Sequence, residues 1–210
     1  MEIVFLETIS LGEDIDLSRF DELGHVTKYK DTPVELVPER VKDADVVVIN
    51  KIPMNETTLA GALHLKLVAV TATGMDNIDR AYTDSRGIRS ANVAGYSTEA
   101  VAQHTFALMF YVLHKLAYYD HYVKSGAYCT SVQFSHFEQK FSELAGKIWG
   151  IVGMGAIGQR VAQHAEEFGC KVIYYSTSGK NKEQPYEQVT FEELLSRSDL
   201  VSVHAPLNDV

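Results

Sequence analysis

The sequence has only two cysteines among its 210 residues, Cys129 and Cys170. They lie far apart in different local contexts, so they form neither a metal-binding knuckle nor a disulfide framework. The first residues lack a basic start, and their apolar run is too short for a signal peptide. Low cysteine usage is typical of proteins in a reducing compartment, and we predict a cytoplasmic location.

The sequence also lacks clustered basic residues and long apolar runs. Its formal net charge is −9, from 19 Lys and Arg against 28 Asp and Glu. Because a surface that binds phosphates along a strand needs clustered positive charge, we expect no nucleic-acid partner. No apolar run approaches the ~20 residues that cross a bilayer, so we expect no membrane partner. The hydrophobic content of 46% is ordinary for a globular protein with one large domain or two modest ones.

Residues 1–94 alternate short apolar segments with helical patterns. The expected strands are residues 3–6, 45–49 and 67–70, with weaker signals at 26–29 and 88–93. Helical patterns cover residues 55–63 and 79–85, and Gly87 follows the second where a C-cap glycine is expected. This alternation predicts a parallel sheet covered on both faces. The predicted fold class is α/β, with two Rossmann-like or flavodoxin-like parallel-sheet domains, the first formed by residues 1–94.

Residues 95–143 break this alternation. We predict a long helix from Ser97 to about Tyr118, with Ser97 as N-cap and Glu99 in its first turn. The helix is apolar nearly all round, which indicates burial between layers or at a subunit contact. Residues 119–143 are predicted to be irregular and are rich in aromatic side chains. Because such a segment is costly to leave in water, we predict that it packs on another domain or subunit.

The α/β alternation resumes at Lys147. Strands are expected at residues 148–152, 171–175 and 200–204, and helices at 156–168 and 191–196. Rossmann sheets hold about six strands, so we predict that residues 144–210 form an incomplete dinucleotide-binding domain. The pattern of residues 42–48, in which Asp precedes an apolar strand, recurs at residues 196–203. This echo is compatible with two domains of similar build, but α/β proteins also repeat it by chance.

The strongest chemical signal is the sequence GMGAIG at residues 153–158, directly after a predicted strand and at the start of a helix. Gly153 permits the tight turn, Gly155 removes a side chain that would block a pyrophosphate, and Gly158 lets helix and strand pack closely. The amides at the helix start then face the anionic phosphates. We predict dinucleotide binding here, the alternative being a glycine-rich turn without a ligand.

Ser176 occupies the position where NAD-preferring sites carry an acidic residue for the adenosine ribose. It is followed by Thr177, Ser178, Gly179 and Lys180. No carboxylate repels a 2′-phosphate here, and the hydroxyls and Lys180 are suited to bind one. The cofactor is therefore predicted to be NAD or NADP. Either NADP is accepted, or even preferred, or Ser176 simply hydrogen-bonds the ribose of NAD.

Four segments together make the chain resemble the D-2-hydroxyacid dehydrogenase family, which includes glycerate, lactate and phosphoglycerate dehydrogenases. They are TATGMDNID at 71–79, NVAGYSTEAVAQH at 92–104, ELAGK at 143–147 before the glycine loop, and VSVHAPL at 201–207. They occur in the order found in the family. Residues 1–70 match only in pattern.

The resemblance implies an oxidoreductase that transfers a hydride between NAD(P)H and a small 2-keto or D-2-hydroxy acid in a cleft between two domains. Residues 97–104 favour a substrate of the hydroxypyruvate type. The backbone of Ala72, Thr73, Gly74 and Met75 is implied to hold the substrate carboxylate, because successive amides form an anion nest. The implied cofactor-binding residues are Thr73 and Val101 near the nicotinamide, Gly153, Gly155, Ala156, Ile157 and Gly158 at the pyrophosphate, Ser176 at the ribose, and His204, Ala205 and Pro206 beside the adenine. Ordinary packing is the alternative for Val101 and Pro206.

The resemblance also implies what to expect of catalysis and assembly. The family's catalytic Arg, acidic residue and His lie beyond the last matched segment, so we assign no catalytic residue in this chain. Hydride transfer to a keto acid needs a cation and an acid, and we expect a polypeptide of these 210 residues to be inactive. His104, His114 and His164 lie on predicted helices, and no histidine has the spacing of a metal site. Residues 119–143 would form the arm of a homodimer, as in the family.

Two other functions remain open at this point. One is a non-catalytic NAD(H)-binding regulatory protein of the same fold family, which would need no catalytic residues. The other is an S-adenosylmethionine enzyme, which shares glycine-rich strand–helix loops. The Thr73–Gly74 loop and the HAPL sequence at residues 204–207 argue against the latter.

Overall fold

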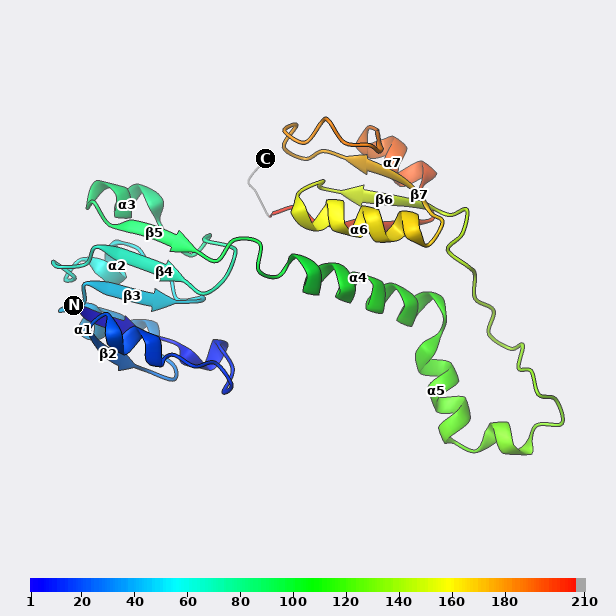
Figure 1. Cartoon of the computed structure of the whole chain (residues 1–210), viewed down its shortest axis with the longest axis horizontal. Coiled ribbons are helices and arrows are strands. Elements are labelled where there is room, and N and C mark those ends of the chain that lie inside the picture. Colours follow the sequence, from blue (N-terminus) through cyan, green and yellow to red (C-terminus); the bar gives the residue numbers. More distant parts are fainter. Residues whose placement is uncertain (207–210) are drawn as a thin grey trace. The chain divides into compact units, whose positions relative to one another are not determined.

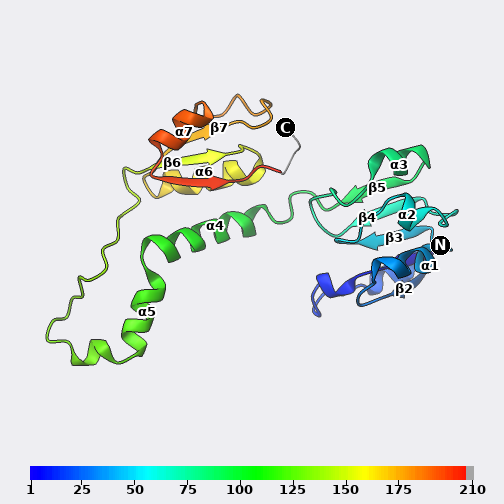
Figure 2. The same cartoon turned by 180° about the vertical axis from the view of Figure 1, so that it is seen from behind.

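Two parallel β-sheets organise the structure, a computed structural model that describes residues 1–206. The chain forms two compact units, Met1–Tyr96 and a second that begins at Ser97 (Figures 1 and 2). Leu207, the last residue of the fourth family-like segment, lies outside the described residues. No helix among the described residues has the length and apolar character needed to span a bilayer.

The first unit contains a sheet of five strands in the order β2-β1-β3-β4-β5, with every neighbouring pair parallel. This is the strand order of flavodoxin-like folds. The strands are β1 (Glu2–Phe5), β2 (His25–Lys28), β3 (Val46–Ile49), β4 (Leu67–Val70) and β5 (Arg89–Asn92). The helices are α1 (Val37–Val41), α2 (Glu56–Leu59) and α3 (Arg80–Ser85), with short 3-10 turns η1 (Thr8–Ser10), η2 (Ser18–Glu22) and η3 (Val34–Leu36).

The alternation of side chains along the strands gives this sheet two buried faces. On β1, Val4 packs into one hydrophobic cluster, whereas Ile3 and Phe5 pack into another on the opposite side. On β3, Val47 belongs to the first cluster and Val48 to the second. Because both faces are covered, these strands are continuous runs of apolar residues, as the sequence indicated.

The second unit contains a sheet of four parallel strands in the order β8-β7-β6-β9. Numbered along the chain, this order is 3-2-1-4, which begins the Rossmann order. The strands are β6 (Ile148–Val152), β7 (Lys171–Tyr175), β8 (Glu187–Gln188) and β9 (Leu200–Val203). The helices are α4 (Thr98–Leu113), α5 (Leu116–Lys124), α6 (Ala156–Glu167) and α7 (Phe191–Arg197), with the 3-10 turn η4 (Ala127–Thr130).

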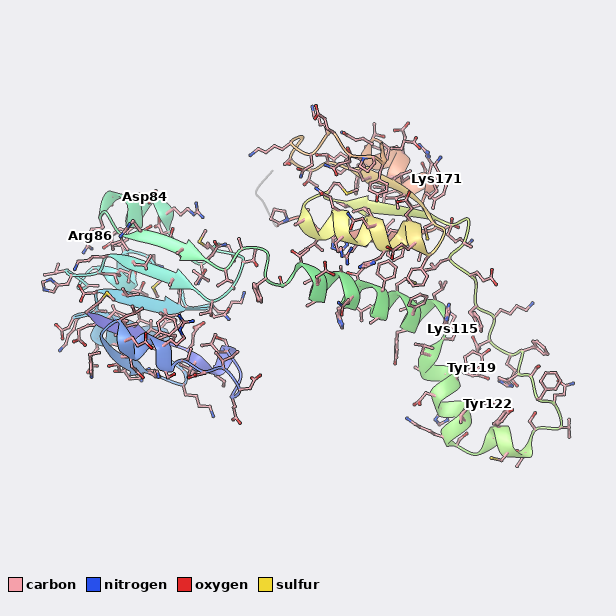
Figure 3. The ribbon with its side chains drawn as sticks, viewed as in Figure 1. Asp84, Arg86, Lys115, Tyr119, Tyr122 and Lys171 are labelled. Atoms are coloured by element: carbon pink, nitrogen blue, oxygen red, sulfur yellow. The ribbon has the colours of Figure 1, made fainter. Side chains whose placement is uncertain are left out.

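The long helix predicted from Ser97 is shorter than expected. It ends at Leu113, and Lys115 adopts a left-handed conformation (φ 55°) that separates α4 from α5. Helix α5, which carries Tyr119 and Tyr122 (Figure 3), extends to Lys124, so the prediction of irregular structure from residue 119 was wrong. Ser97 occupies the N-cap position, but its side chain makes no capping hydrogen bond.

Only one side of α4 is buried within its unit, although the helix is apolar nearly all round. Ala102 and Phe106 are buried, and the Phe106 ring lies 4.8 Å from the Trp149 ring. Leu108 and Val112 remain exposed. The prediction that the remaining apolar surface packs at a subunit contact stays a prediction.

The echo between residues 42–48 and 196–203 has a structural counterpart. In the first unit, the Asp45 carboxylate accepts a hydrogen bond from the amide of Glu2, at the start of β1 (2.9 Å). In the second, the Asp199 carboxylate accepts one from the amide of Ile148, at the start of β6 (2.9 Å). Each aspartate also pairs with a lysine, Lys66 or Lys147 respectively. In each sheet, an aspartate just before one strand thus bonds to the first amide of the neighbouring strand.

Candidate functional site

The glycine loop at residues 153–158 joins β6 to α6, and each of its three glycines has a separate structural reason. Gly153 has φ +91°, and a Cβ there would lie 2.6 Å from the carbonyl oxygen of His204. A Cβ on Gly158 would lie 2.1 Å from the carbonyl oxygen of Gly153. A Cβ on Gly155 would meet nothing within 4 Å, and its φ of −76° suits any residue. The fold therefore requires Gly153 and Gly158, whereas at Gly155 the missing side chain leaves open space.

The open space at Gly155 lies at the amino end of α6. Gly155 is the N-cap of this 12-residue helix and provides no capping side chain. The first amides of a helix, here those of Ala156 and Ile157, have no partner within the helix. With the helix dipole they favour an anion at this position. An open cradle beside free amides fits the pyrophosphate of a dinucleotide.

The residues that follow β9 lie beside this loop because β9 pairs with β6. The amide of His204 donates to the carbonyl oxygen of Val152 (2.8 Å), which precedes Gly153. The His204 ring contacts the Ser202 hydroxyl (3.1 Å), which also accepts from the Trp149 indole (2.9 Å). Burial lowers the pKa of His204, so its ring is neutral at neutral pH. His204, followed by Ala205 and Pro206, thus forms an uncharged edge at the point where the strand order reverses.

Ser176 follows β7 directly and is buried. The carbonyl oxygen of Tyr175 accepts from the amide of Gly153 (2.9 Å), so Ser176 follows a residue that contacts the glycine loop. Lys180 is exposed, with its amide donating to the Ser178 hydroxyl (3.3 Å). The structure therefore brings the glycine loop, Ser176 and the His204 segment to one edge of the second sheet.

The predicted substrate loop, residues 72–75, follows β4 in the first unit. Two of its carbonyl groups are held by hydrogen bonds. The carbonyl oxygen of Ala72 accepts from the amide of Val93 (3.1 Å), and that of Thr73 from the Asn92 side chain (2.6 Å). In the described part of the chain, the amides of residues 72–75 donate to no main-chain oxygen. Four consecutive amides are thus left available, as an anion nest requires.

The family resemblance predicts that Thr73 and Val101 both lie near the nicotinamide. Thr73 is exposed in the first unit, and its hydroxyl donates to the carbonyl oxygen of Val93 (3.2 Å). Val101 is exposed on α4 in the second unit. Their shared role stays a prediction.

Sequence reasoning missed Glu7, a buried carboxylate that bonds to the turn following β3. Glu7 follows β1 closely, and its oxygens accept from three successive amides, those of Asn50 (2.8 Å), Lys51 and Ile52 (3.2 Å). An acidic residue directly after a buried strand, at the edge where the carboxyl ends of parallel strands meet, was the available signal. Its partners are 43 to 45 residues away, so the sequence did not reveal them.

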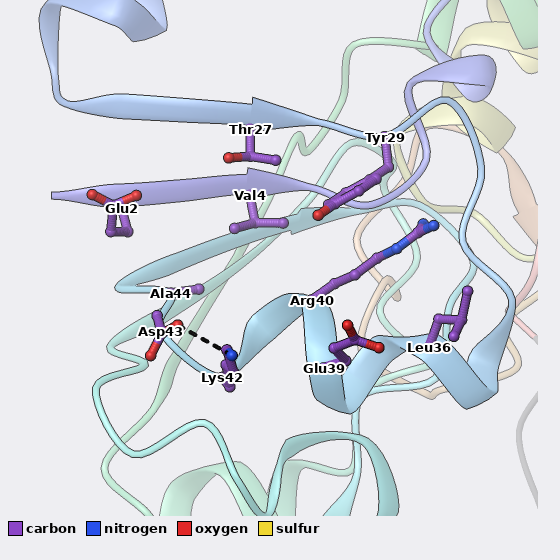
Figure 4. Close-up of a pocket in the computed structure, with 10 residues that line it drawn as sticks. All are labelled: Glu2, Val4, Thr27, Tyr29, Leu36, Glu39, Arg40, Lys42, Asp43 and Ala44. Atoms are coloured by element: carbon purple, nitrogen blue, oxygen red, sulfur yellow. Dashed lines mark ion pairs between the residues drawn. The ribbon is translucent and has the colours of Figure 1, made fainter.

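A depression of about 520 Å³ lies elsewhere in the first unit, between α1 and the strands β1 and β2 (Figure 4). Its cations already have partners. The Arg40 guanidinium lies 3.9 Å from the centre of the Tyr29 ring and donates to the carbonyl oxygen of Asp31, and Lys42 faces Asp43. It contains none of the predicted site residues, and three carboxylates outnumber its two cations, so we assign it no ligand.

The chain is similar to known proteins over nearly its whole length. Residues 106–210 match the family described as "D-isomer specific 2-hydroxyacid dehydrogenase, NAD binding domain". The glycerate dehydrogenase of Methylorubrum extorquens is 34% identical over 208 residues, which are 98% of this chain and 64% of that protein. The chain spans 64% to 66% of the length of the first curated relatives that it matches.

Two solved structures extend the match to the fold. A D-lactate dehydrogenase from Aquifex aeolicus, complexed with NAD and lactic acid, has a TM-score of 0.82 and 27% identity, covering 98% of this chain and 61% of that one. An acyclic imino acid reductase in complex with NADPH and D-Arg has a TM-score of 0.86 and 28% identity, covering 99% and 66%. The family match covers half of the residues, and the chain belongs to the D-isomer-specific 2-hydroxyacid dehydrogenase family.

Proposed function

We propose that this chain binds NAD or NADP at the Gly153–Gly158 loop and the carboxylate of a small 2-keto acid at residues 72–75. The bound nicotinamide would supply or accept the hydride that interconverts the keto acid and the D-2-hydroxy acid. The observation that carries this proposal is the open space at Gly155 beside the free amides of α6. The fold itself does not need a glycine there, whereas a pyrophosphate does.

The residues of the second unit would divide the dinucleotide between them. The amides of Ala156 and Ile157 would hold the pyrophosphate, and Ser176 would hydrogen-bond the adenosine ribose. The uncharged edge formed by His204, Ala205 and Pro206 suits an adenine, which is flat and neutral. Val101 would lie beside the nicotinamide, together with Thr73 of the first unit.

The free amides at residues 72–75 would bind the carboxylate that every 2-hydroxy acid shares. Relatives named for glycerate and for lactic acid support a small substrate. We propose a hydroxypyruvate-type keto acid as the preferred one. No residue of this chain is assigned as the acid that protonates the alkoxide, so we propose that a polypeptide of these 210 residues binds without turnover.

A direct test titrates the 210-residue polypeptide with NADH and NADPH by calorimetry and follows hydroxypyruvate reduction by loss of NADH absorbance. We expect saturable binding and no reduction. Absence of binding at millimolar dinucleotide would refute the proposal, and measurable reduction would refute the assignment of no catalytic residue. Binding of NADH without binding of any 2-keto acid would favour the alternative, a regulatory protein that senses NAD(H).

We also propose that residues 119–143 mediate a homodimer. Within this segment, residues 131–143 are held to α5 by aromatic contacts, among them the His136 ring stacked on Tyr122 (centroids 3.9 Å apart) and hydrogen-bonded to the Tyr118 hydroxyl (2.6 Å). Beyond these contacts, Phe134 is 91% exposed and Phe137 is 75% exposed. Large apolar side chains held in this way on a surface mark a protein–protein contact.

A further inference from the structure

The turn at residues 50–52, which follows β3, is held by hydrogen bonds to Glu7. The Glu7 side chain is buried, and its carboxylate accepts from the amides of Asn50, Lys51 and Ile52. Hydrogen bonds to an ionised acceptor are stronger than neutral ones, so three of them hold this turn in one conformation. The turn is therefore a preformed element, and the direction in which its side chains leave the backbone is set by Glu7.

The same turn is joined to the substrate loop from the other side. The Asn77 side chain donates to the carbonyl oxygens of Asn50 (3.3 Å) and Ile52 (2.9 Å). The amide of Met54 donates to the carbonyl oxygen of Asn77 (2.8 Å). Asn77 lies only two residues after the four free amides. Asn77 therefore joins the turn to the segment that follows the predicted carboxylate site.

Lys51 lies at the same edge of the sheet as that site. Ile49 pairs with Val70 at the carboxyl ends of the parallel strands β3 and β4, so the turn that carries Lys51 and the loop that begins at Ala72 follow neighbouring strand ends. Lys51 is exposed. Among the described residues, the ion pairs of this unit that involve lysine use Lys42 and Lys66 and leave the Lys51 ammonium without a carboxylate.

The substrate loop itself provides no positive charge for an anion. Its four amides are neutral, and Asp76, which follows them, is exposed and acidic. Arg80 is another cation in this unit. Its guanidinium lies 3.9 Å from the sulfur of Met75, and the Met75 side chain packs against the core. A cation on the neighbouring turn would offset the charge of Asp76, and Lys51 is exposed and has no carboxylate partner among the described residues.

We propose that Lys51 is a substrate-binding residue whose ammonium pairs with the carboxylate of the 2-keto acid, and that Glu7 is the positioning residue that fixes the turn carrying it. This inference rests on the proposed function, because it takes residues 72–75 as the carboxylate site. It adds to the amide nest a charged ligand from a different strand.

The test titrates the NADH-saturated polypeptide with oxamate, an inert mimic of a 2-keto acid, and follows the backbone amide resonances of residues 50–52 and 72–75. We expect Lys51→Met to weaken oxamate binding about tenfold, the usual effect of losing a charge-assisted hydrogen bond, and Lys51→Arg to retain most of the affinity. Lys30→Met is the matched control. It removes the same charge from the same edge of the sheet, beyond β2, and should leave the affinity unchanged.

Glu7→Gln tests the positioning role. It should weaken oxamate binding in the wild-type background, but cause no further loss when combined with Lys51→Met, because Glu7 acts through Lys51. A purely structural role would give the same loss in both backgrounds. The dispersion of the backbone amide resonances of the first unit, which contains all of these substitutions, reports whether each variant is folded.

The outcomes separate this inference from the proposed function. If the wild-type polypeptide binds NADH but no oxamate, the carboxylate site is wrong and Lys51 has no role. If it binds oxamate and Lys51→Met binds equally well, the site stands and the inference is overturned. Loss of affinity in Arg80→Met but not in Lys51→Met would likewise overturn it and assign the charge to Arg80.

Discussion

The carbonyl oxygen of His204 lies 2.6 Å from the position that a Cβ atom on Gly153 would occupy. The ends of β6 and β9 therefore approach each other as closely as a glycine allows, at the point where the order of the strands reverses. Open α/β sheets collect ligands at this point. The fold needs a glycine at position 153, where the backbones pack closely. At position 155, where the space is open, only a ligand would need one.

Alanine substitutions at two glycines should separate these requirements. Gly158→Ala places a Cβ against the carbonyl oxygen of Gly153, so we expect it to lower the free energy of unfolding by about 1–3 kcal/mol. Gly155→Ala meets no atom, so we expect a change in stability within about 1 kcal/mol. It should nevertheless weaken NADH binding at least about tenfold, since the Cβ occupies the space of the pyrophosphate. Urea unfolding and NADH fluorescence titration measure the two effects. Unchanged NADH affinity in Gly155→Ala would contradict the assignment.

The cofactor preference should respond to charge at Ser176. Because this residue is buried at the end of β7, a carboxylate there has few ways to turn aside from a bound ribose. We expect Ser176→Asp to weaken NADPH binding more than about tenfold through repulsion of the 2′-phosphate, and to weaken NADH binding far less. Lys180→Ala should lower the affinity for NADPH alone. Calorimetric titration with both dinucleotides measures this, and a wild-type polypeptide that binds NADH and rejects NADPH would disprove it.

The Asp199 carboxylate should make the stability of the second unit dependent on pH. The hydrogen bond from the Ile148 amide and the one from Lys147 lower its pKa below the ordinary value of 3.8. A lowered pKa in the folded state gives stability that is present above the unfolded-state pKa and is lost as pH falls through the folded-state value. Asp199→Asn should therefore be less stable than wild type at pH 7, and the difference should be smaller at pH 3, below the ordinary pKa of 3.8. Urea unfolding at the two pH values tests this, with Asp84→Asn, at an exposed position on α3, as the control.

Oligomeric state should depend on the exposed phenylalanines of residues 119–143. We expect Phe134→Ser combined with Phe137→Ser to convert a dimer to a monomer in sedimentation velocity, because both side chains are largely exposed in the isolated chain. Leu63→Ser removes an apolar side chain that is 77% exposed on the first unit and should leave the dimer intact. A wild-type polypeptide that sediments as a monomer at all concentrations would exclude this role.

Local patterns predicted the parts of the fold that depend on local interactions. The buried strands of both sheets and the turn at residues 153–158 were predicted because apolar runs and glycines define them over a few residues. Helix α5 was missed because its tyrosines have low helix propensity and no capping residue marks its start, which Lys115 forms in a left-handed conformation. Strand β8 was missed because it has two residues, Glu187 and Gln188, with no apolar pattern.

The candidate site was also predicted from local motifs, and the roles of its residues stay predictions. The residues of each loop belong to contiguous motifs, so the sequence alone could suggest a role for each of them. The role of Glu7 depends on partners that only the pairing of β1 with β3 brings near, and no motif encodes that pairing. The free amides of residues 72–75 could be proposed from the glycine in that loop, but the side chain of Asn92 that holds the loop's carbonyl group could not.

The carbonyl groups of the substrate loop are anchored to Asn92 and Val93, at the end of β5, which is the last strand in its sheet. Terminal strands open more readily than central ones, because they have a neighbour on one side only. On warming, the peptide groups around Thr73 would thus reorient while β1 and β3 are still intact. The ability to capture a carboxylate would disappear at a lower temperature than the one at which the sheet melts, and amide hydrogen exchange at β5 would follow the loss.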